Sequence, residues 1–282
     1  MTATGVKHRA LPAAGKLRRI GSEFVALLGL PARKRRRMAG APMLPATRGV
    51  LALLLAAVFI GAAMFVLDNS ALARQKRVPI WVIDLFNAIT DYGRSGWFLW
   101  PSGILIIALA LLVAMMQQRF ARLTIISLIV RLEFMFIAIA LPGLVGTIVK
   151  HVIGRVRPSA VGPFAYVPFT WRAEYASMPS GHATTAFAVA VAFGALWPRA
   201  RPLLWIYALA IAASRVIIAA HYPSDVVAGA CLGGFGALLI RNYFAARHLG
   251  FAAAPDGTVL RLPGPSLRRI SSTFARLFAP AS

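Results

Sequence analysis

Long apolar segments alternate with short polar ones along most of the chain. A helix that crosses a membrane needs about 20 mostly apolar residues. The most apolar segment covers residues 50–67 and contains no charged side chain. Five more follow, at residues 97–116, 123–149, 183–197, 203–220 and 226–244, and two of them are short as purely apolar runs. The pattern predicts an all-α, polytopic membrane protein with about six transmembrane helices.

The polar parts of the chain divide around these six segments. We expect a basic tail over residues 1–49, a membrane domain over residues 50–245 and a second basic tail over residues 246–282. Residues 79–97 mix aromatic and polar side chains, which favours an interfacial helix before the second span. Each tail also carries apolar residues at helical spacing beside Lys and Arg. A helix lying on anionic lipid and a disordered basic tail both fit this spacing.

The composition agrees with a membrane protein and excludes an ordinary cytosolic enzyme. Hydrophobic residues make up 59% of the chain, only 14% are charged, and the mean hydropathy is +0.71. The formal net charge of +23 is typical of nucleic-acid-binding proteins, but such proteins are far less apolar, so we expect no nucleic-acid partner. The single cysteine, Cys231, excludes an intrachain disulfide and a cysteine-based metal cluster.

The basic residues predict the orientation of the spans. One side of the membrane receives eleven Lys and Arg before residue 50, two in each of the loops 117–122 and 198–202, and six from residue 241 onward. The other side receives four in residues 68–96 and four in residues 150–178. The positive-inside rule then places both termini in the cytoplasm. The compact basic chain is typical of a bacterial inner-membrane protein whose loops 68–96, 150–182 and 221–225 face the periplasm or exterior.

Three polar motifs fall on this outward face, where polar groups at membrane depth are costly and tend to be functional. The first is Lys150, Arg157 and Pro158 at the end of the third segment. Arginine offers a planar fork to phosphate oxygens, and lysine adds a mobile point charge. The motif therefore fits an anion site, and taken alone it fits simple anchoring of a helix end as well.

The second motif is Pro179-Ser180-Gly181-His182, directly before the fourth segment. Proline followed by serine, glycine and an apolar run predicts the start of a helix. The free backbone N–H groups and the dipole at a helix N-terminus favour an anion, which would lie beside His182. A plain N-cap followed by a surface histidine is the alternative.

The third motif contains Ser214, Arg215, His221 and Asp225, where the fifth segment ends and the sixth begins. Ser214 and His221 stand two helical turns apart, so we expect them on one helical face. We also expect Asp225 to accept a hydrogen bond from His221, which would fix the tautomer of the imidazole and leave its other nitrogen free to attack. Capping the sixth helix is a second role that fits Asp225.

Together the motifs read K-x6-R-P, P-S-G-H and S-R-x5-H-x3-D, in that order and on one face. This combination resembles the type 2 phosphatidic acid phosphatase (PAP2) superfamily, which includes lipid phosphate phosphatases, bacterial acid phosphatases and vanadium haloperoxidases. The signature covers residues 150–225, and every motif residue is present without a change in spacing. The six-span layout resembles the integral-membrane lipid phosphatase branch, which implies a PAP2-like helical bundle.

The resemblance implies a role for each motif residue. His221 matches the nucleophile that forms a phosphohistidine, Asp225 the carboxylate that orients it, and His182 the general acid. The residues that match the phosphate-binding set are Lys150, Arg157, Ser180, Gly181 and Arg215. Phosphoryl transfer needs positioning and neutralisation of charge on oxygen, which these cations and a helix N-terminus supply without a metal. We therefore expect no cofactor and no metal.

Four ionisable residues in or next to the third segment lie outside the motif positions. His151 and Arg155 stand between motif residues, and either is a possible substrate contact. Arg131 and Glu133 interrupt the third segment and do not face each other on one helix. We expect Arg131 to reach toward the cytoplasmic surface and Glu133 to pair with a neighbouring helix.

The function expected from these features is a membrane lipid phosphatase acting through a phosphohistidine. It would cleave a phosphomonoester or pyrophosphate from a lipid such as phosphatidic acid, phosphatidylglycerol phosphate, undecaprenyl pyrophosphate or lipid A. Two alternatives stay open: a phosphotransferase that passes the phosphoryl group to another lipid, and a transporter or binding protein for lipid phosphates without turnover. Transporters place polar groups near the midplane of the bilayer rather than at one boundary. The sequence leaves the oligomeric state open.

Overall fold

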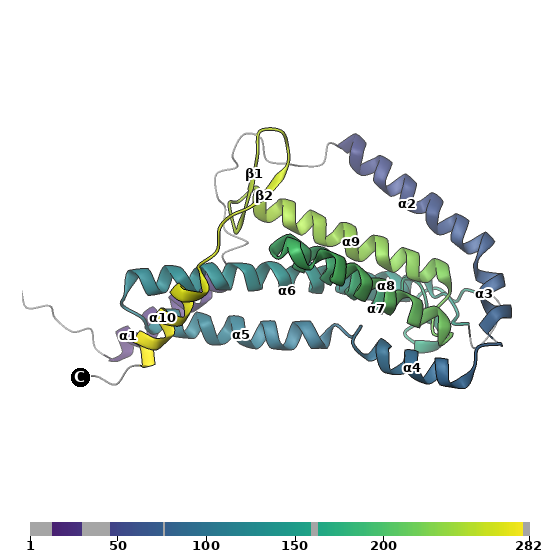
Figure 1. Cartoon of the computed structure of the whole chain (residues 1–282), viewed down its shortest axis with the longest axis horizontal. Coiled ribbons are helices and arrows are strands. Elements are labelled where there is room, and N and C mark those ends of the chain that lie inside the picture. The colour runs from purple at the N-terminus through teal and green to yellow at the C-terminus, as the bar shows by residue number, and fades with distance from the viewer. Residues whose placement is uncertain (1–12, 30–45, 76, 159–162, 279–282) are drawn as a thin grey trace, which may run out of the picture.

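The computed structural model describes residues 13–29, 46–75, 77–158 and 163–278. Most of this part of the chain is helical (Figure 1). The long helices are α2 (Ala46–Val66), α5 (Gly96–Met115), α6 (Arg119–Ile153), α7 (Gly181–Leu196), α8 (Arg201–Ile217) and α9 (Pro223–Ala245). The shorter ones are α1 (Ala13–Leu28), α3 (Asp68–Gln75), α4 (Ile80–Asp91) and α10 (Leu267–Phe278).

Each of the six predicted spans is a helix in the structure. Within the described residues, five helical stretches are long and apolar enough to cross a membrane, and the second of them joins α4 to α5. The sixth, α7, has only 16 residues and is rich in alanine and glycine. The helix expected within residues 79–97 is α4.

Helices α6, α7 and α9 form the centre of the bundle, with α5 and α8 packed on its flanks. Small side chains let α7 and α9 approach closely, as is common where membrane helices pack. A Cβ added to Gly229 would collide with the carbonyl oxygen of Ser180, and one added to Gly233 would collide with that of Thr184. This close packing holds the N-terminal ends of both helices side by side.

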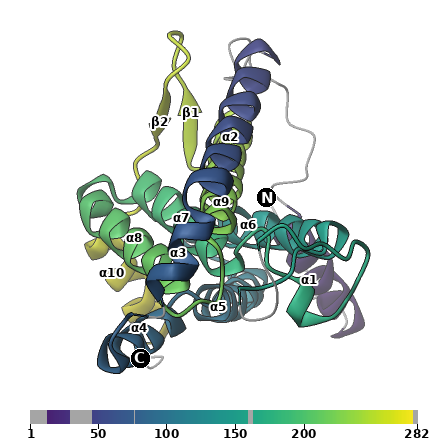
Figure 2. The ribbon, with the colours of Figure 1, turned by 90° about the vertical axis from the view of Figure 1, so that its right-hand side faces the viewer.

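The two ends of the bundle carry different elements. Helices α3 and α4 lie at the right-hand end in Figure 1, whereas α1 and α10 lie at the left-hand end beside α5 and α6. Figure 2, viewed from the right-hand end, shows α2 and α3 running along α9. Both tails thus contain a helix, and Leu27 of α1 is buried in the main hydrophobic core.

A small antiparallel hairpin follows α9 and was absent from the sequence prediction. It pairs β1 (Phe251–Ala253) with β2 (Val259–Arg261). Asp256 and Gly257 form its turn, and Gly257 has a φ of 82°, so an Asp-Gly turn signal was present in the sequence. Phe251 is buried against Phe134 of α6, with the ring centroids 4.8 Å apart, which attaches the hairpin to the bundle.

Candidate active site

Four helix ends meet at the end of the bundle that carries α3 and α4, and they bring the three sequence motifs together. Arg157, after α6, donates to the carbonyl oxygen of Ala220, after α8, at 3.0 Å. The backbone N–H of Ser180, before α7, donates to the carbonyl oxygen of Asp225 in α9 at 2.9 Å. Lys150 lies beside the start of α7: a Cβ added to Gly181 would lie 3.3 Å from Nζ of Lys150.

The first motif is placed by the way α6 ends. Gly154 caps the helix in the left-handed conformation with a φ of 64°, which glycine adopts at little cost. The returning loop packs directly on it, since a Cβ at Gly154 would collide with the carbonyl oxygen of Val167. The sharp exit turns Arg157 back over the end of the bundle.

His221 lies in a tight turn after α8. The helix ends at Ile217, Ala219 has a φ of 50°, and the backbone N–H of His221 donates to the carbonyl oxygen of Arg215 at 3.1 Å. The expectation that Ser214 and His221 share a helical face is therefore wrong. Pro223 begins α9 and limits this segment to a short turn.

The contact between His221 and Asp225 runs partly through a third residue. Nδ1 of His221 lies 3.7 Å from Oδ2 of Asp225, too far for the direct hydrogen bond that we expected. The buried Ser177 hydroxyl donates to the same Oδ2 at 2.5 Å and lies 3.5 Å from Nδ1. Oδ2 also accepts the backbone N–H of Tyr222, the N-cap residue of α9, at 2.9 Å, so Asp225 does hold the start of this helix.

The environment of His221 keeps its imidazole neutral. Burial, aided by the charges of Arg157 and Arg215, lowers the pKa of His221 to about 4, although the carboxylate of Asp225 opposes the shift. A neutral imidazole has a lone pair on one ring nitrogen. With Nδ1 facing Ser177 and Asp225, Nε2 is the nitrogen left for chemistry.

Two of the expected phosphate-binding residues present polar atoms that nothing in the described structure satisfies. Ser180 is the N-cap residue of α7, yet its buried hydroxyl caps no backbone group and has no hydrogen-bond partner among the described residues. Nε of the buried Arg215 is also unpartnered there, while its NH1 donates to Thr90 at 2.7 Å. Buried polar atoms are rarely left unpaired, so these groups indicate a site for an anion.

His182 faces a cavity beside these groups. It lies in the first turn of α7 and is half-buried. The cavity has a volume of about 570 Å³ and lies between the start of α5, the middle of α6 and the start of α7. Its polar lining residues, near His182, include Arg94, Ser95 and Thr147. Its apolar lining residues, along the bundle, include Leu99, Ile139, Ala140 and Leu144.

Comparisons with known proteins identify the family of this chain. The family model described as the PAP2 superfamily matches residues 131–249. The lipid A 1-phosphatase of Rhizobium etli is 31% identical over 201 residues, which cover 70% of this chain and 86% of that protein. The chain belongs to the PAP2 superfamily. It is a PAP2-type phosphatase, a phosphoric monoester hydrolase, and an integral membrane protein.

Two further comparisons concern other PAP2 proteins. The lipid A 1-phosphatase of Rhizobium johnstonii is 32% identical over 184 residues, covering 64% of this chain and 75% of that protein. The crystal structure of the transmembrane PAP2 type phosphatidylglycerolphosphate phosphatase from Bacillus subtilis shows 21% sequence identity. It matches with a TM-score of 0.41 over 79% of this chain and 94% of that chain.

Several residues around the PAP2 motifs were missed from the sequence. Ser177 contacts Asp225, Thr90 holds Arg215, and Gly93 packs so closely on His182 that a Cβ there would lie 2.9 Å from the imidazole. Residues 90 and 93 belong to the aromatic segment that we had interpreted only as interfacial. No local pattern marks them, because the contacts arise between segments that are far apart in the sequence.

Arg155 and Glu133 differ from their sequence expectations. Arg155 is fully buried in ion pairs with Asp68 and Asp225, so the interpretation of Arg155 as a substrate contact is wrong. The expected interhelical partner of Glu133 is also absent: among the described residues, neither oxygen of its buried carboxyl group has a hydrogen-bond partner. Arg131 donates to the carbonyl oxygen of Leu262, in the segment after the hairpin, at 3.1 Å.

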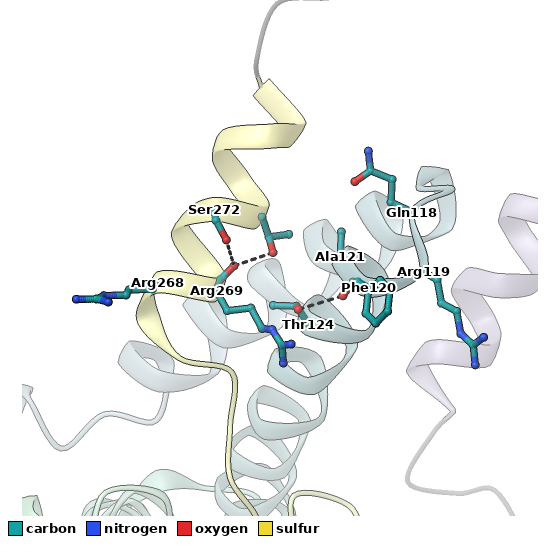
Figure 3. Close-up of a pocket in the computed structure, with 9 residues that line it drawn as sticks. Gln118, Arg119, Phe120, Ala121, Thr124, Arg268, Arg269 and Ser272 are labelled. Carbon is teal, nitrogen blue, oxygen red and sulfur yellow. Dashed lines mark hydrogen bonds between the residues drawn. The ribbon is translucent and has the colours of Figure 1, made fainter.

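A second hollow lies far from the PAP2 motifs, at the other end of α6. Its volume is about 720 Å³, and it is lined by the first turns of α6 and by α10, including Arg119, Arg268 and Arg269. Figure 3 shows the side chains of Arg119 and Arg268 pointing away from each other, and no interaction between the three guanidinium groups is drawn. The arginines therefore do not converge on one anion.

Proposed function

We propose that this PAP2 phosphatase removes the 1-phosphate from lipid A by a metal-independent phosphohistidine mechanism, on the outer face of the inner membrane of a bacterium. The observation that carries the chemistry is the neutral, buried His221 beside the Ser180 hydroxyl and the Arg215 Nε, two atoms that have no hydrogen-bond partner among the described residues. The substrate is supported by the two lipid A 1-phosphatases, of which this chain covers 86% and 75%.

In the first step, Nε2 of His221 attacks phosphorus and the bond to the leaving oxygen breaks. His182 gives that oxygen its proton, so the lipid leaves as an alcohol. Arg157, Arg215 and Lys150, with the N-terminus of α7, neutralise the charge on the three equatorial oxygens. Asp225 stabilises the positive charge that His221 gains as it becomes a phosphohistidine.

In the second step, His182 takes a proton from water, whose oxygen attacks phosphorus. The P–N bond breaks, inorganic phosphate leaves and His221 returns to its neutral form. Splitting the reaction into two in-line displacements lowers the barrier of each. Apart from the substrate and water, both steps use only side chains and backbone groups of this chain.

An amphiphilic substrate fits the cavity beside His182. The phosphate end would lie near His182 and Arg94, while Leu99, Ile139 and Leu144 offer an apolar continuation toward the middle of the bundle. The outward orientation is supported by the distribution of Lys and Arg, which is concentrated at the tails and at the loops of the opposite end.

The test is a phosphate-release assay with purified protein in detergent and EDTA. The panel contains lipid A, phosphatidic acid, phosphatidylglycerol phosphate and undecaprenyl pyrophosphate, and mass spectrometry of the lipid A product locates the lost phosphate. We expect the highest kcat/KM for lipid A and loss at position 1. Preference for another lipid, loss at another position, or dependence on a divalent ion would contradict the proposal. Transfer to an added lipid alcohol without phosphate release would identify a phosphotransferase.

Two variants make this assay specific. His221→Ala should lower kcat at least about a thousandfold, because the nucleophile is gone. His248→Asn is the matched control, since His248 lies after α9 at the other end of the bundle and asparagine tolerates its φ of 54°. The control should keep wild-type activity.

A further inference from the structure

Every N–H group of the Arg155 guanidinium donates a hydrogen bond within the protein. Its NH1 donates to Asp225 Oδ1 and to Ser224 Oγ, each at 2.6 Å, and its NH2 donates to Asp68 at 2.7 Å. The carbonyl oxygen of Pro163 accepts from Nε at 3.1 Å and from NH2 at 2.9 Å. These contacts use all five N–H groups of the guanidinium, so none is left for a substrate.

Asp68 is buried as completely as Arg155, with no exposed surface. It follows α2 and begins α3, and it lies outside residues 131–249, which match the superfamily model. Its Oδ1 accepts the backbone N–H of Ser224 at 3.0 Å, and its Oδ2 accepts the Ser224 hydroxyl at 2.6 Å. The start of α3 therefore brings a carboxylate to the residue next to Asp225.

The charges of this network explain why Arg155 needs a second carboxylate. Arg155 alone would neutralise Asp225 and weaken its attraction for a positive charge on His221. Two carboxylates around one guanidinium leave a net charge of about −1 in a buried region, where charges interact more strongly than in water. Asp68 thus restores the negative charge that Arg155 removes.

The geometry also shows how the network orients the catalytic carboxylate. Arg155 holds Oδ1 of Asp225, which leaves Oδ2 facing Ser177 and His221. The guanidinium of Arg155 lies over the ring of Tyr222, 4.3 Å from its centroid, and this contact fixes it further.

We propose that Asp68 and Arg155 are positioning residues of the active site: they lock the carboxylate of Asp225 and set the net negative charge that His221 meets when it becomes a phosphohistidine. The start of α3 then helps to position the active site. This inference rests on the proposed role of His221 as the nucleophile. A purely structural ion pair, which only closes the fold, is the alternative that the experiment must exclude.

The charged groups around His221 influence its pKa and therefore the acidic limb of the pH profile. Asp225 faces it from α9, Arg215 from α8, Arg157 from the segment after α6, and His182 from α7. None of these changes when Asp68 is replaced. At a separation on the order of 10 Å and an effective dielectric constant of about 20, one charge shifts a pKa by about one unit.

The test compares three variants: two change the net charge in opposite directions, and the third restores it. Asp68→Asn brings the charge of the network from −1 to zero, Arg155→Gln brings it to −2, and the double variant restores −1. We expect Asp68→Asn to lower kcat about tenfold or more, with KM changed less than about twofold, and to shift the acidic limb of kcat/KM down by about one pH unit. The double variant should regain a limb at the wild-type pH because the net charge returns to −1, while its kcat stays below that of wild type because Arg155 no longer holds Oδ1 of Asp225.

A purely structural ion pair predicts lower thermal stability in Asp68→Asn, with an unshifted acidic limb and an unchanged kcat for the enzyme that remains folded. If the limb of the double variant stays shifted, or the limb of Asp68→Asn does not shift, while circular dichroism and thermal unfolding show both variants folded, the proposal is overturned. If Asp68→Asn does not fold, Asp68→Glu carries the test: it keeps the charge, so a shifted limb there would also overturn the proposal.

The assay separates this inference from the substrate proposal. Each variant is measured against wild type on whichever member of the lipid panel the wild type cleaves fastest. Failure on lipid A would refute the proposed substrate and leave the charge comparison readable on another lipid phosphate. Ser102→Ala serves as the control with wild-type kinetics, because the hydroxyl of this buried serine donates to carbonyl oxygens of its own helix, α5.

Discussion

Ser177→Ala tests whether the contact between His221 and Asp225 runs through a hydroxyl. Ser177 is fully buried, donates to Oδ2 of Asp225 at 2.5 Å and lies 3.5 Å from Nδ1 of His221. Without it, Nδ1 of His221 has Oδ2 at 3.7 Å, beyond hydrogen-bond distance. Asp225 still accepts bonds from Arg155 at 2.6 Å and from the backbone of Tyr222 at 2.9 Å, so the carboxylate should stay in place.

The size of the effect follows from the kind of bond that is lost. A hydrogen bond to a charged group contributes about 1.5–3 kcal/mol. If that stabilisation acts on the imidazole in the transition state, kcat falls about 10- to 100-fold, since each 1.36 kcal/mol corresponds to about a factor of ten. KM should change little, because Ser177 is buried behind His221 and its hydroxyl is directed at Asp225.

The assay is release of inorganic phosphate in detergent, with kcat and KM measured separately. Ser102→Ala is the matched control, because it also removes a buried serine hydroxyl, at a site whose bonds stay within α5. Thermal unfolding of both variants reports whether either has lost its fold. A kcat for Ser177→Ala within about twofold of wild type, with an intact fold, would refute the proposed bridge.

Three further predictions follow from the same site. Because burial lowers the pKa of His221 to about 4, the imidazole is neutral above that pH. In a pH profile, kcat/KM should therefore fall about tenfold per pH unit below pH 4, and His221 should cause no break near pH 6.5. Gly181→Ala places a Cβ 3.3 Å from Lys150 Nζ, so KM for the phosphate should rise several-fold, as steady-state kinetics will show. Gly229→Ala forces a Cβ onto the carbonyl oxygen of Ser180 and should cost about 1–3 kcal/mol or more, seen as a lower Tm in detergent.

The helical spans and the motif residues were accessible from local patterns. Apolar length alone located the six long helices, because a membrane helix must satisfy its backbone internally and therefore leaves a continuous apolar run. The motifs were visible because their spacing is local: His221 and Asp225 stand on either side of the proline that starts α9. Even the hairpin after α9 had a local signal in its Asp-Gly turn.

The errors arose where a residue's role depends on a distant segment. Local spacing favoured a direct bond from His221 to Asp225, but Ser177, from the loop before α7, lies between them. Helical spacing also placed His221 on the face of α8, although the turn at Ala219 ends the helix earlier. Glu133 looked like one half of an interhelical pair, and its partner does not exist among the described residues.

The sequence by itself determined that the chain crosses a membrane, that it carries the PAP2 motifs, and that their basic and histidine side chains gather at one end. Membrane burial and helix termini leave local marks, so no tertiary information was needed for these conclusions. Only the tertiary structure decided that Asp68 and Arg155 belong with Asp225. Their ion pairs join residues separated by 87 and 70 positions, and such pairs form only because α2 and the loop after α6 meet at the start of α9.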